Sequence, residues 1–162
     1  MEIKEIRVGI ADLNVVSNPD RLITVGLGSC VGIALYDAVL KVAGLAHIML
    51  PDSTQFTNVT NPFKFADSAI PILIERLKEL GASLPNLQAK IAGGASMFSF
   101  SDKAMIMNIG SRNSEAVKAT LERFNIPIIA EDVGGNRGRT MLLDSATGIV
   151  QIKTVGLPIK EL

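Results

Sequence analysis

The most apolar part of the chain lies in two runs, at residues 31–36 and 42–50, which a short break separates. Both runs are short and rich in Val, Ile and Leu, which is typical of buried strands. We therefore predict a β-hairpin whose turn spans residues 37–40. With that turn, Cys30 lies directly opposite His47.

Cys30 is the only cysteine of the chain, and His47 is its only histidine. Directly opposed residues on neighbouring strands have Cβ atoms about 4.5–5.5 Å apart, so the predicted pairing places a nucleophile beside a base. The prediction depends on the assumed turn, because Asp37-Ala-Val-Leu40 lacks the Asn-Gly or Asp-Gly pair that fixes a tight hairpin. A slip of one residue would turn one of the two side chains to the opposite face.

The remaining pattern predicts strands on both sides of this hairpin. Alternation at residues 3–10 and 12–16 indicates a strand or a strand pair, and residues 22–26 form a short strand that leads into a glycine-containing turn. Further strands are predicted at residues 87–91 and 126–131, and a second hairpin at residues 141–143 and 149–155. A polar stretch at residues 51–61 follows His47 and is expected to be a surface loop that helps to cover a site.

Apolar residues at helical spacing predict a helix over residues 63–80. Pro71 lies inside this segment, so the helix is expected to kink there or to begin afresh near Ser68. A second helix is predicted over residues 114–124, with Ser111 or Asn113 as its N-cap. The chain is thus predicted to form one α/β domain over residues 1–162, with mixed β-sheets and two main helices.

Composition narrows the classes of function. Sixteen basic and sixteen acidic residues balance among the 162, so nothing in the charge indicates capture of nucleic acid or of an anionic membrane. No uninterrupted apolar run is long enough to cross a bilayer, and the first residues are no signal peptide. One Cys and one His supply too few ligands for a zinc site. We expect a cytoplasmic protein that needs no metal or cofactor and does not insert into a membrane.

Cys30 follows a Gly-x-Gly-Ser turn, in which backbone N–H groups near Gly28 and Ser29 can point at a developing oxyanion. Single cysteines are more often buried and inert, and a histidine on an apolar strand is more often a core residue. An imidazole within reach of the thiol would nevertheless promote the thiolate, and Thr24, on the preceding strand, offers a hydroxyl to orient it. A catalytic and a structural interpretation of Cys30 therefore both stand at this point.

A second glycine-rich stretch, at residues 134–139, superficially suggests phosphate binding. It matches neither the dinucleotide-binding fingerprint nor the P-loop, because no Lys-Ser or Lys-Thr follows its glycines. We interpret it as a structural turn between strands.

Several motifs resemble those of the CheD family, the chemoreceptor glutamine deamidases of bacterial and archaeal chemotaxis. They occur in the family's order over nearly the whole chain: Gly26-Leu-Gly-Ser-Cys-Val31, Gly44-Leu-Ala-His-Ile-Met-Leu-Pro51, Ala89-Lys-Ile-Ala-Gly-Gly-Ala-Ser-Met-Phe98, Ile109-Gly-Ser-Arg-Asn113 and Asp132-Val-Gly-Gly-Asn-Arg-Gly-Arg139. One departure is Ser111, where many members carry an acidic residue.

The resemblance implies a three-layer α/β sandwich and a papain-like site in which Cys30, His47 and Thr24 are catalytic. It implies that the substrate is a glutamine side chain on the methyl-accepting cytoplasmic helices of chemoreceptors, and that some members also act on a methyl ester there. It further implies binding to CheC, the phosphatase of phosphorylated CheY.

Two other classes remain open from the sequence. One is a non-catalytic chemotaxis protein that binds receptors or CheC and in which Cys30 is only structural. The other is a Cys protease or a transglutaminase, although a chain of this length with few long loops has little material for a long substrate cleft.

Overall fold

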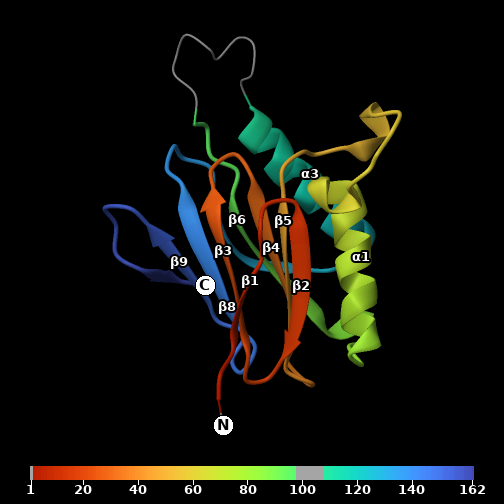
Figure 1. Ribbon diagram of the computed structural model, residues 1–162, viewed down its shortest axis with the longest axis vertical. Coiled ribbons are helices and arrows are strands. Elements are labelled where there is room, and N and C mark those ends of the chain that lie inside the picture. The colour runs from red at the N-terminus through yellow and green to blue at the C-terminus, as the bar shows by residue number, and fades with distance from the viewer. Residues whose placement is uncertain (1, 98–107) are drawn as a thin grey trace.

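The computed structural model describes residues 2–97 and 108–162 (Figure 1). Phe98, the last residue of one motif quoted above, lies outside the described residues. The described residues form two five-stranded sheets that face each other, and two α-helices that cover the outer face of one of them. The predicted three-layer α/β sandwich is therefore confirmed.

Both sheets are mixed, since each contains one parallel pair of strands. The first sheet has the order β1 (Glu5–Arg7), β3 (Arg21–Leu27), β8 (Arg139–Asp144), β9 (Val150–Thr154) and β10 (Lys160–Glu161). The second sheet has the order β2 (Asp12–Ser17), β5 (Val42–Ile48), β4 (Val31–Asp37), β6 (Leu87–Gly93) and β7 (Ile128–Val133). The helices are α1 (Ala66–Glu79) and α3 (Ile109–Arg123), with short 3-10 turns at Ser53–Gln55, Pro62–Lys64 and Leu84–Asn86.

The central hairpin of β4 and β5 is buried on both faces, which explains its uninterrupted apolar runs. Val31, Ile33 and Leu35 face the helices in one core cluster. Ala34 and Leu45 belong to a second cluster, between the two sheets. The site residues of β5 that face the first sheet therefore lie inside the sandwich.

The hairpin forms as predicted, but its register differs by two residues from the prediction. Asp37 is the last residue of β4 rather than part of the turn, and its carboxylate accepts the N–H groups of Val39 and Leu40. His47 consequently lies opposite Gly32 and not opposite Cys30. Because side chains alternate with a period of two, a shift of two residues keeps Cys30 on the face of His47. Cys30 indeed packs against the cluster between the sheets.

The first helix begins at Ala66, later than predicted, and Pro71 lies inside it without dividing it in two. The second helix begins earlier, at Ile109, so Ser111 and Asn113 are not its N-cap. The residue at that position is Asn108, which has a left-handed backbone and makes no capping hydrogen bond with its side chain. The first turn of α3 contains the weak helix formers Gly and Ser, so helix propensity does not predict it. Packing against the second sheet stabilises this turn.

The end of β6 packs directly on the backbone of Cys30. Gly93 has a φ of +111°, and a Cβ atom there would collide with the Cys30 carbonyl. The next residue, Gly94, donates its N–H to that carbonyl at 2.8 Å. Only glycine fits at position 93, because any side chain would meet both the backbone strain and the steric clash.

Substitution of Gly93 by Ala should lower the free energy of unfolding by at least about 2 kcal/mol, since a backbone clash adds to the cost of a positive φ. Gly9→Ala is the matched control, because a Cβ at Gly9 meets no atom within 4 Å and its φ is not positive. Urea unfolding of the two variants measures the difference. Equal stability of both would contradict the close contact.

Candidate functional site

Cys30 lies one residue before β4 and is half-buried. Its carbonyl accepts the Gly94 N–H, and the carbonyl of the preceding residue, Ser29, accepts a side-chain N–H of Asn113 at 2.9 Å. Burial raises the pKa of the Cys30 thiol, and the N–H of its own backbone opposes that rise in part. The thiol is therefore protonated at neutral pH until a base takes its proton.

His47 is fully buried in β5, and its side chain is hydrogen-bonded to a residue of the first sheet. Its Nδ1 atom lies 2.7 Å from the hydroxyl oxygen of Thr24 in β3, and that hydroxyl lies 2.8 Å from the carbonyl oxygen of Val8. A carbonyl only accepts hydrogen bonds, so the single proton of the Thr24 hydroxyl points to Val8. The hydroxyl oxygen must then accept a proton from Nδ1 of His47.

This hydrogen-bond chain fixes the tautomer of His47. In the neutral ring, a proton on Nδ1 leaves a lone pair on Nε2. Nε2 is buried and has no hydrogen-bond partner among the described residues. A buried and unpartnered lone pair is costly in a purely structural histidine, and it is what a general base requires.

Cys30 and His47 occupy diagonal positions on one face, since His47 pairs with Gly32, two residues after Cys30. Diagonal neighbours lie about 7–8 Å apart or somewhat less at Cβ, within reach of an aromatic ring. The structure thus places Cys30, just before β4, on the same face as His47 of β5, and brings Thr24 of β3 into contact with His47. The residue predicted to orient the base does contact it.

The turn before Cys30 supplies candidate oxyanion donors. The N–H of Gly28 is directed to the Gly26 carbonyl, and the Gly28 carbonyl accepts the N–H of Ala95. Gly28 therefore supports the turn. Within residues 2–97 and 108–162, the N–H groups of Ser29 and Cys30 have no backbone carbonyl as partner. These two N–H groups, rather than that of Gly28, are available to an oxyanion.

The glycine-rich loop at residues 134–139 supports the end of β6, which contacts the Cys30 backbone. Arg139 is buried, pairs with Asp132 at 3.5 Å, and donates hydrogen bonds to the carbonyls of Gly93 and Gly134. It thereby holds the end of β6 that contacts the Cys30 backbone. The loop joins β7 to β8, as predicted for a turn between strands.

No group of three or more potential metal ligands occurs in the part of the chain that the structure describes. No helix there is both long and apolar enough to cross a bilayer.

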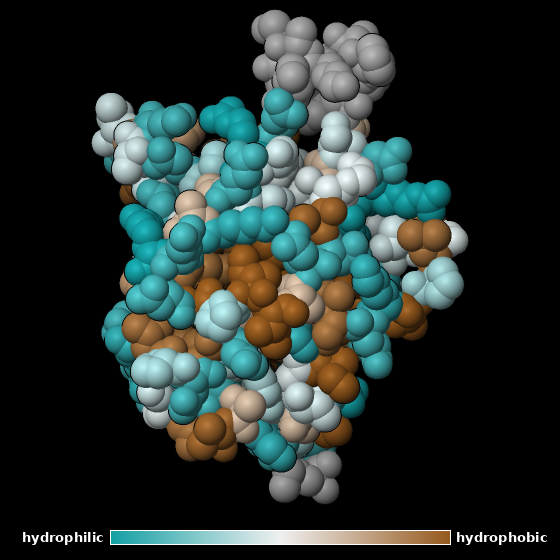
Figure 2. Space-filling model, turned by 180° about the vertical axis from the view of Figure 1, so that it is seen from behind, coloured by the Kyte–Doolittle hydropathy of each residue, from teal (hydrophilic) through white to brown (hydrophobic). Residues whose placement is uncertain are grey.

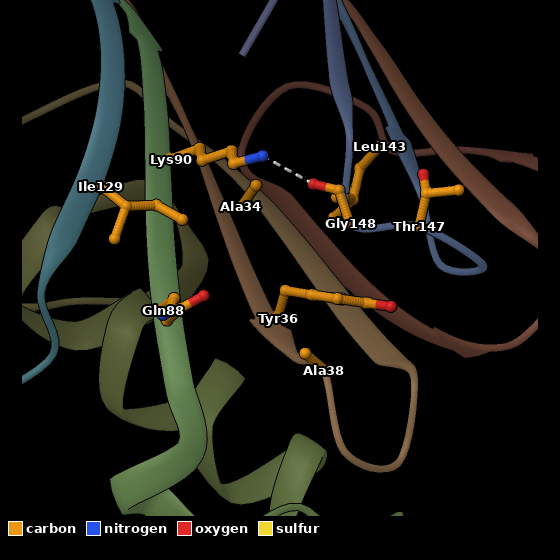
Figure 3. Close-up of a pocket in the computed structure, with 9 residues that line it drawn as sticks. All are labelled: Ala34, Tyr36, Ala38, Gln88, Lys90, Ile129, Leu143, Thr147 and Gly148. Carbon is orange, nitrogen blue, oxygen red and sulfur yellow. Dashed lines mark hydrogen bonds between the residues drawn. The ribbon is translucent and has the colours of Figure 1, made fainter.

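A hollow of about 190 Å³ lies away from the candidate site, between β4, β6 and β8, where Lys90 donates to the Gly148 carbonyl at 2.9 Å (Figure 3). None of Cys30, His47 and Thr24 lines it. Figure 2 shows apolar side chains gathered in the middle of one face of the molecule.

Comparison with known proteins gives the family. A family model described as CheD chemotactic sensory transduction matches residues 49–154. The chain is 66% identical, over all 162 residues and the full length of each relative, to proteins of Clostridium botulinum (strain Hall) and Clostridium kluyveri, both named "Probable chemoreceptor glutamine deamidase CheD". The chain belongs to the CheD family.

One solved structure, that of the Bacillus licheniformis hypothetical protein YfiH, matches with a TM-score of 0.46. The two chains are 16% identical, and the match covers 75% of this chain and 49% of the other. The CheD resemblance drawn from the motifs is confirmed by the family model and by the full-length relatives.

Sequence reasoning misses one polar residue beside the candidate site. The sequence predicts Asn113 as a possible N-cap, but this residue is fully buried in α3 and donates to the carbonyls of Ser29 and Met49. Its spacing holds a signal, because residues 113, 117 and 121 share one face of a helix. Val117 and Leu121 are buried, and the stripe that they form extends back to Asn113 because the helix begins at Ile109.

Burial lowers the pKa of His47 from 6.5 to about 4. Between these two values the unfolded chain binds a proton at His47 that the native protein does not, so this contribution to stability is present above pH 6.5 and is lost as the pH falls toward 4. The loss should reach about 3 kcal/mol. We expect the stability advantage of the wild type over His47→Gln to shrink on acidification, as measured by urea unfolding between pH 7 and pH 4. An advantage that is the same at every pH would contradict the buried, neutral imidazole.

Proposed function

We propose that this chain is a chemoreceptor glutamine deamidase in which Cys30 is the nucleophile, His47 the general base and acid, and Thr24 the residue that orients His47. The observation that carries the proposal is the chain of hydrogen bonds from His47 Nδ1 through Thr24 to Val8, which leaves the Nε2 lone pair free on the face of Cys30. The names of the full-length relatives supply the substrate class.

In the first half of the reaction, Nε2 of His47 takes the proton of the Cys30 thiol. The sulfur attacks the carboxamide carbon of the glutamine, a C–S bond forms, and the π electrons of the carbonyl move to oxygen. The N–H groups of Ser29 and Cys30 stabilise that oxyanion. When the intermediate collapses, the C–N bond breaks, Nε2–H protonates the leaving nitrogen, and ammonia departs from a thioester.

In the second half, the neutral imidazole takes a proton from water, and the resulting hydroxide attacks the thioester carbon. The C–S bond breaks, the sulfur regains a proton from Nε2–H, and the side chain leaves as glutamate. Each event therefore adds one negative charge and one potential methylation site to a receptor helix. Because the methyl-accepting helices are cytoplasmic, the proposal places the protein in the cytoplasm.

Binding of the phosphatase CheC, which the family resemblance implies, belongs to the same proposal as a means of regulation. A protein interface is formed by a surface much wider than one thiol. Loss of the nucleophile should therefore leave the affinity for CheC and for receptor helices nearly unchanged, which separates the catalytic role from a purely scaffolding role.

Cys30→Ala should reduce deamidation of a receptor fragment to background, because the covalent route requires the sulfur. The variant should lose at most about 2 kcal/mol of stability, since the thiol lies at the edge of the core. Mass spectrometry of the fragment, beside a binding assay with the same fragment and with CheC, measures both properties. Full deamidation by the variant would overturn the assignment of the nucleophile.

Thr24→Val keeps the shape of the side chain but removes the acceptor for His47 Nδ1–H. We expect kcat to fall about 10- to 100-fold, the typical cost of losing a residue that orients a ligand or base. Thr24→Ser retains the hydroxyl and is the matched control, expected to stay within a few-fold of the wild type. If the two variants have the same kcat, another group orients His47.

A further inference from the structure

Asn113 is a buried polar residue that the catalytic scheme above does not use. It lies on the face of α3 that packs on the second sheet, among the buried residues Gly110, Ser114, Val117 and Leu121. None of its surface is exposed. An apolar side chain would fill this position without the cost of burying an amide.

The two N–H donors of Asn113 are directed to two backbone carbonyls that flank the catalytic pair. Nδ2 lies 2.9 Å from the oxygen of Ser29, the residue before Cys30, and 2.9 Å from the oxygen of Met49, two residues after His47. The orientation of the amide follows from these partners, because a flipped group would direct its own oxygen at two carbonyl oxygens. We call this pair of hydrogen bonds the Asn113 bridge.

The bridge spans the point where the backbone pairing of β4 and β5 stops. The last pair of that ladder is Val31 and Ile48. Beyond it no ladder hydrogen bond ties Cys30 to β5, so the side chain of Asn113 connects the two strands there. The Cys30 backbone is thus held on both sides, by the Asn113 bridge at Ser29 and by the Gly94 N–H at its own carbonyl.

The unpartnered oxygen of the Asn113 amide argues against a role of this residue in stability alone. Oδ1 of Asn113 is buried and has no hydrogen-bond partner among the described residues. A half-satisfied buried amide is a poor device for stabilising a helix on a sheet. The residue is instead suited to hold two carbonyls at a fixed separation, which neither a hydroxyl nor an apolar side chain does.

We propose that Asn113 is a positioning residue: it sets the placement of the Cys30 sulfur relative to Nε2 of His47 by fixing the two strand ends that carry them. This proposal rests on the proposed function for its effect on turnover. Proton transfer from thiol to imidazole requires hydrogen-bond distance, and a small misplacement of reacting groups costs up to about 100-fold in rate.

The test compares two truncations on the same face of α3, one turn apart. Asn113→Ala removes the bridge, and Val117→Ala removes a buried apolar side chain that does not contact the strand ends through hydrogen bonds. Asn113→Asp is a second variant of the same size, in case the truncation does not fold; it offers at most one O–H donor in place of two N–H donors. Thermal unfolding reports the stability of all three.

Two readouts are measured on each variant. The first is the pH dependence of Cys30 alkylation by iodoacetamide, which needs no receptor and reports the thiol–imidazole geometry. The second is kcat and KM for a receptor fragment. For both Asn113 variants we expect alkylation to be at least several-fold slower at neutral pH, because a displaced imidazole takes the proton of the thiol less readily, and we expect the rate to depend less on the neutral form of His47. We expect kcat to fall about 10-fold or more at a KM within three-fold of the wild type. Val117→Ala should lose stability with both readouts unchanged.

The outcomes separate this proposal from the proposed function. If Asn113→Asp, or a folded Asn113→Ala, has the alkylation profile and kcat of Val117→Ala, Asn113 is structural and the positioning role is overturned. If the wild type fails to deamidate any receptor fragment, the proposed function fails, whereas the alkylation profiles still decide whether Asn113 positions the thiol. A larger effect on KM than on kcat would also overturn positioning, because it would indicate a role in binding the receptor.

Discussion

The hydrogen bond between Thr24 and His47 joins the two sheets at the site, and the rest of the geometry depends on it. Thr24 belongs to a strand of the first sheet and His47 to a strand of the second, so the imidazole has its required tautomer only while the sheets keep their spacing. The apolar cluster between the sheets maintains that spacing. Core packing and acid–base chemistry are therefore coupled in this fold. A change in the packing between the sheets would displace the Thr24 hydroxyl that accepts the proton of His47 Nδ1.

Much of this arrangement is visible in the sequence because it depends on periodicity. The strands of the central hairpin and the two helices follow from apolar spacing, and the shared face of Cys30 and His47 survives a wrong register because the error was an even number of residues. The turn itself was not predictable from type, since the Asp37 side chain, and not an Asn-Gly pair, organises it. Thr24 followed from its place on the strand before the glycine turn, and its contact with His47 joins strands of different sheets.

The early start of α3 and the burial of Asn113 depend on tertiary contacts, which the sequence pattern does not show. The first turn of α3 contains Gly and Ser and forms because it packs against the backbone at Gly94 and Ala95, where a Cβ at Gly110 would collide. That early start places Asn113 on the buried stripe rather than at the helix end. No local propensity distinguishes an N-cap asparagine from a buried one, because the difference lies in which carbonyls the folded chain brings within reach.

Burial favours the neutral form of both Cys30 and His47. It raises the pKa of the Cys30 thiol and lowers that of His47, so the resting site holds a neutral thiol and a neutral imidazole. Proton transfer then creates both charges together, and their mutual attraction at short range offsets part of the cost of placing them in a dry site. A neutral resting pair disfavours a standing thiolate, which is the form that reacts with oxidants. The same desolvation that makes the site unreactive at rest makes the oxyanion donors and the imidazolium more effective once a carboxamide carbon lies against the sulfur, because their electrostatic interactions are not screened by water.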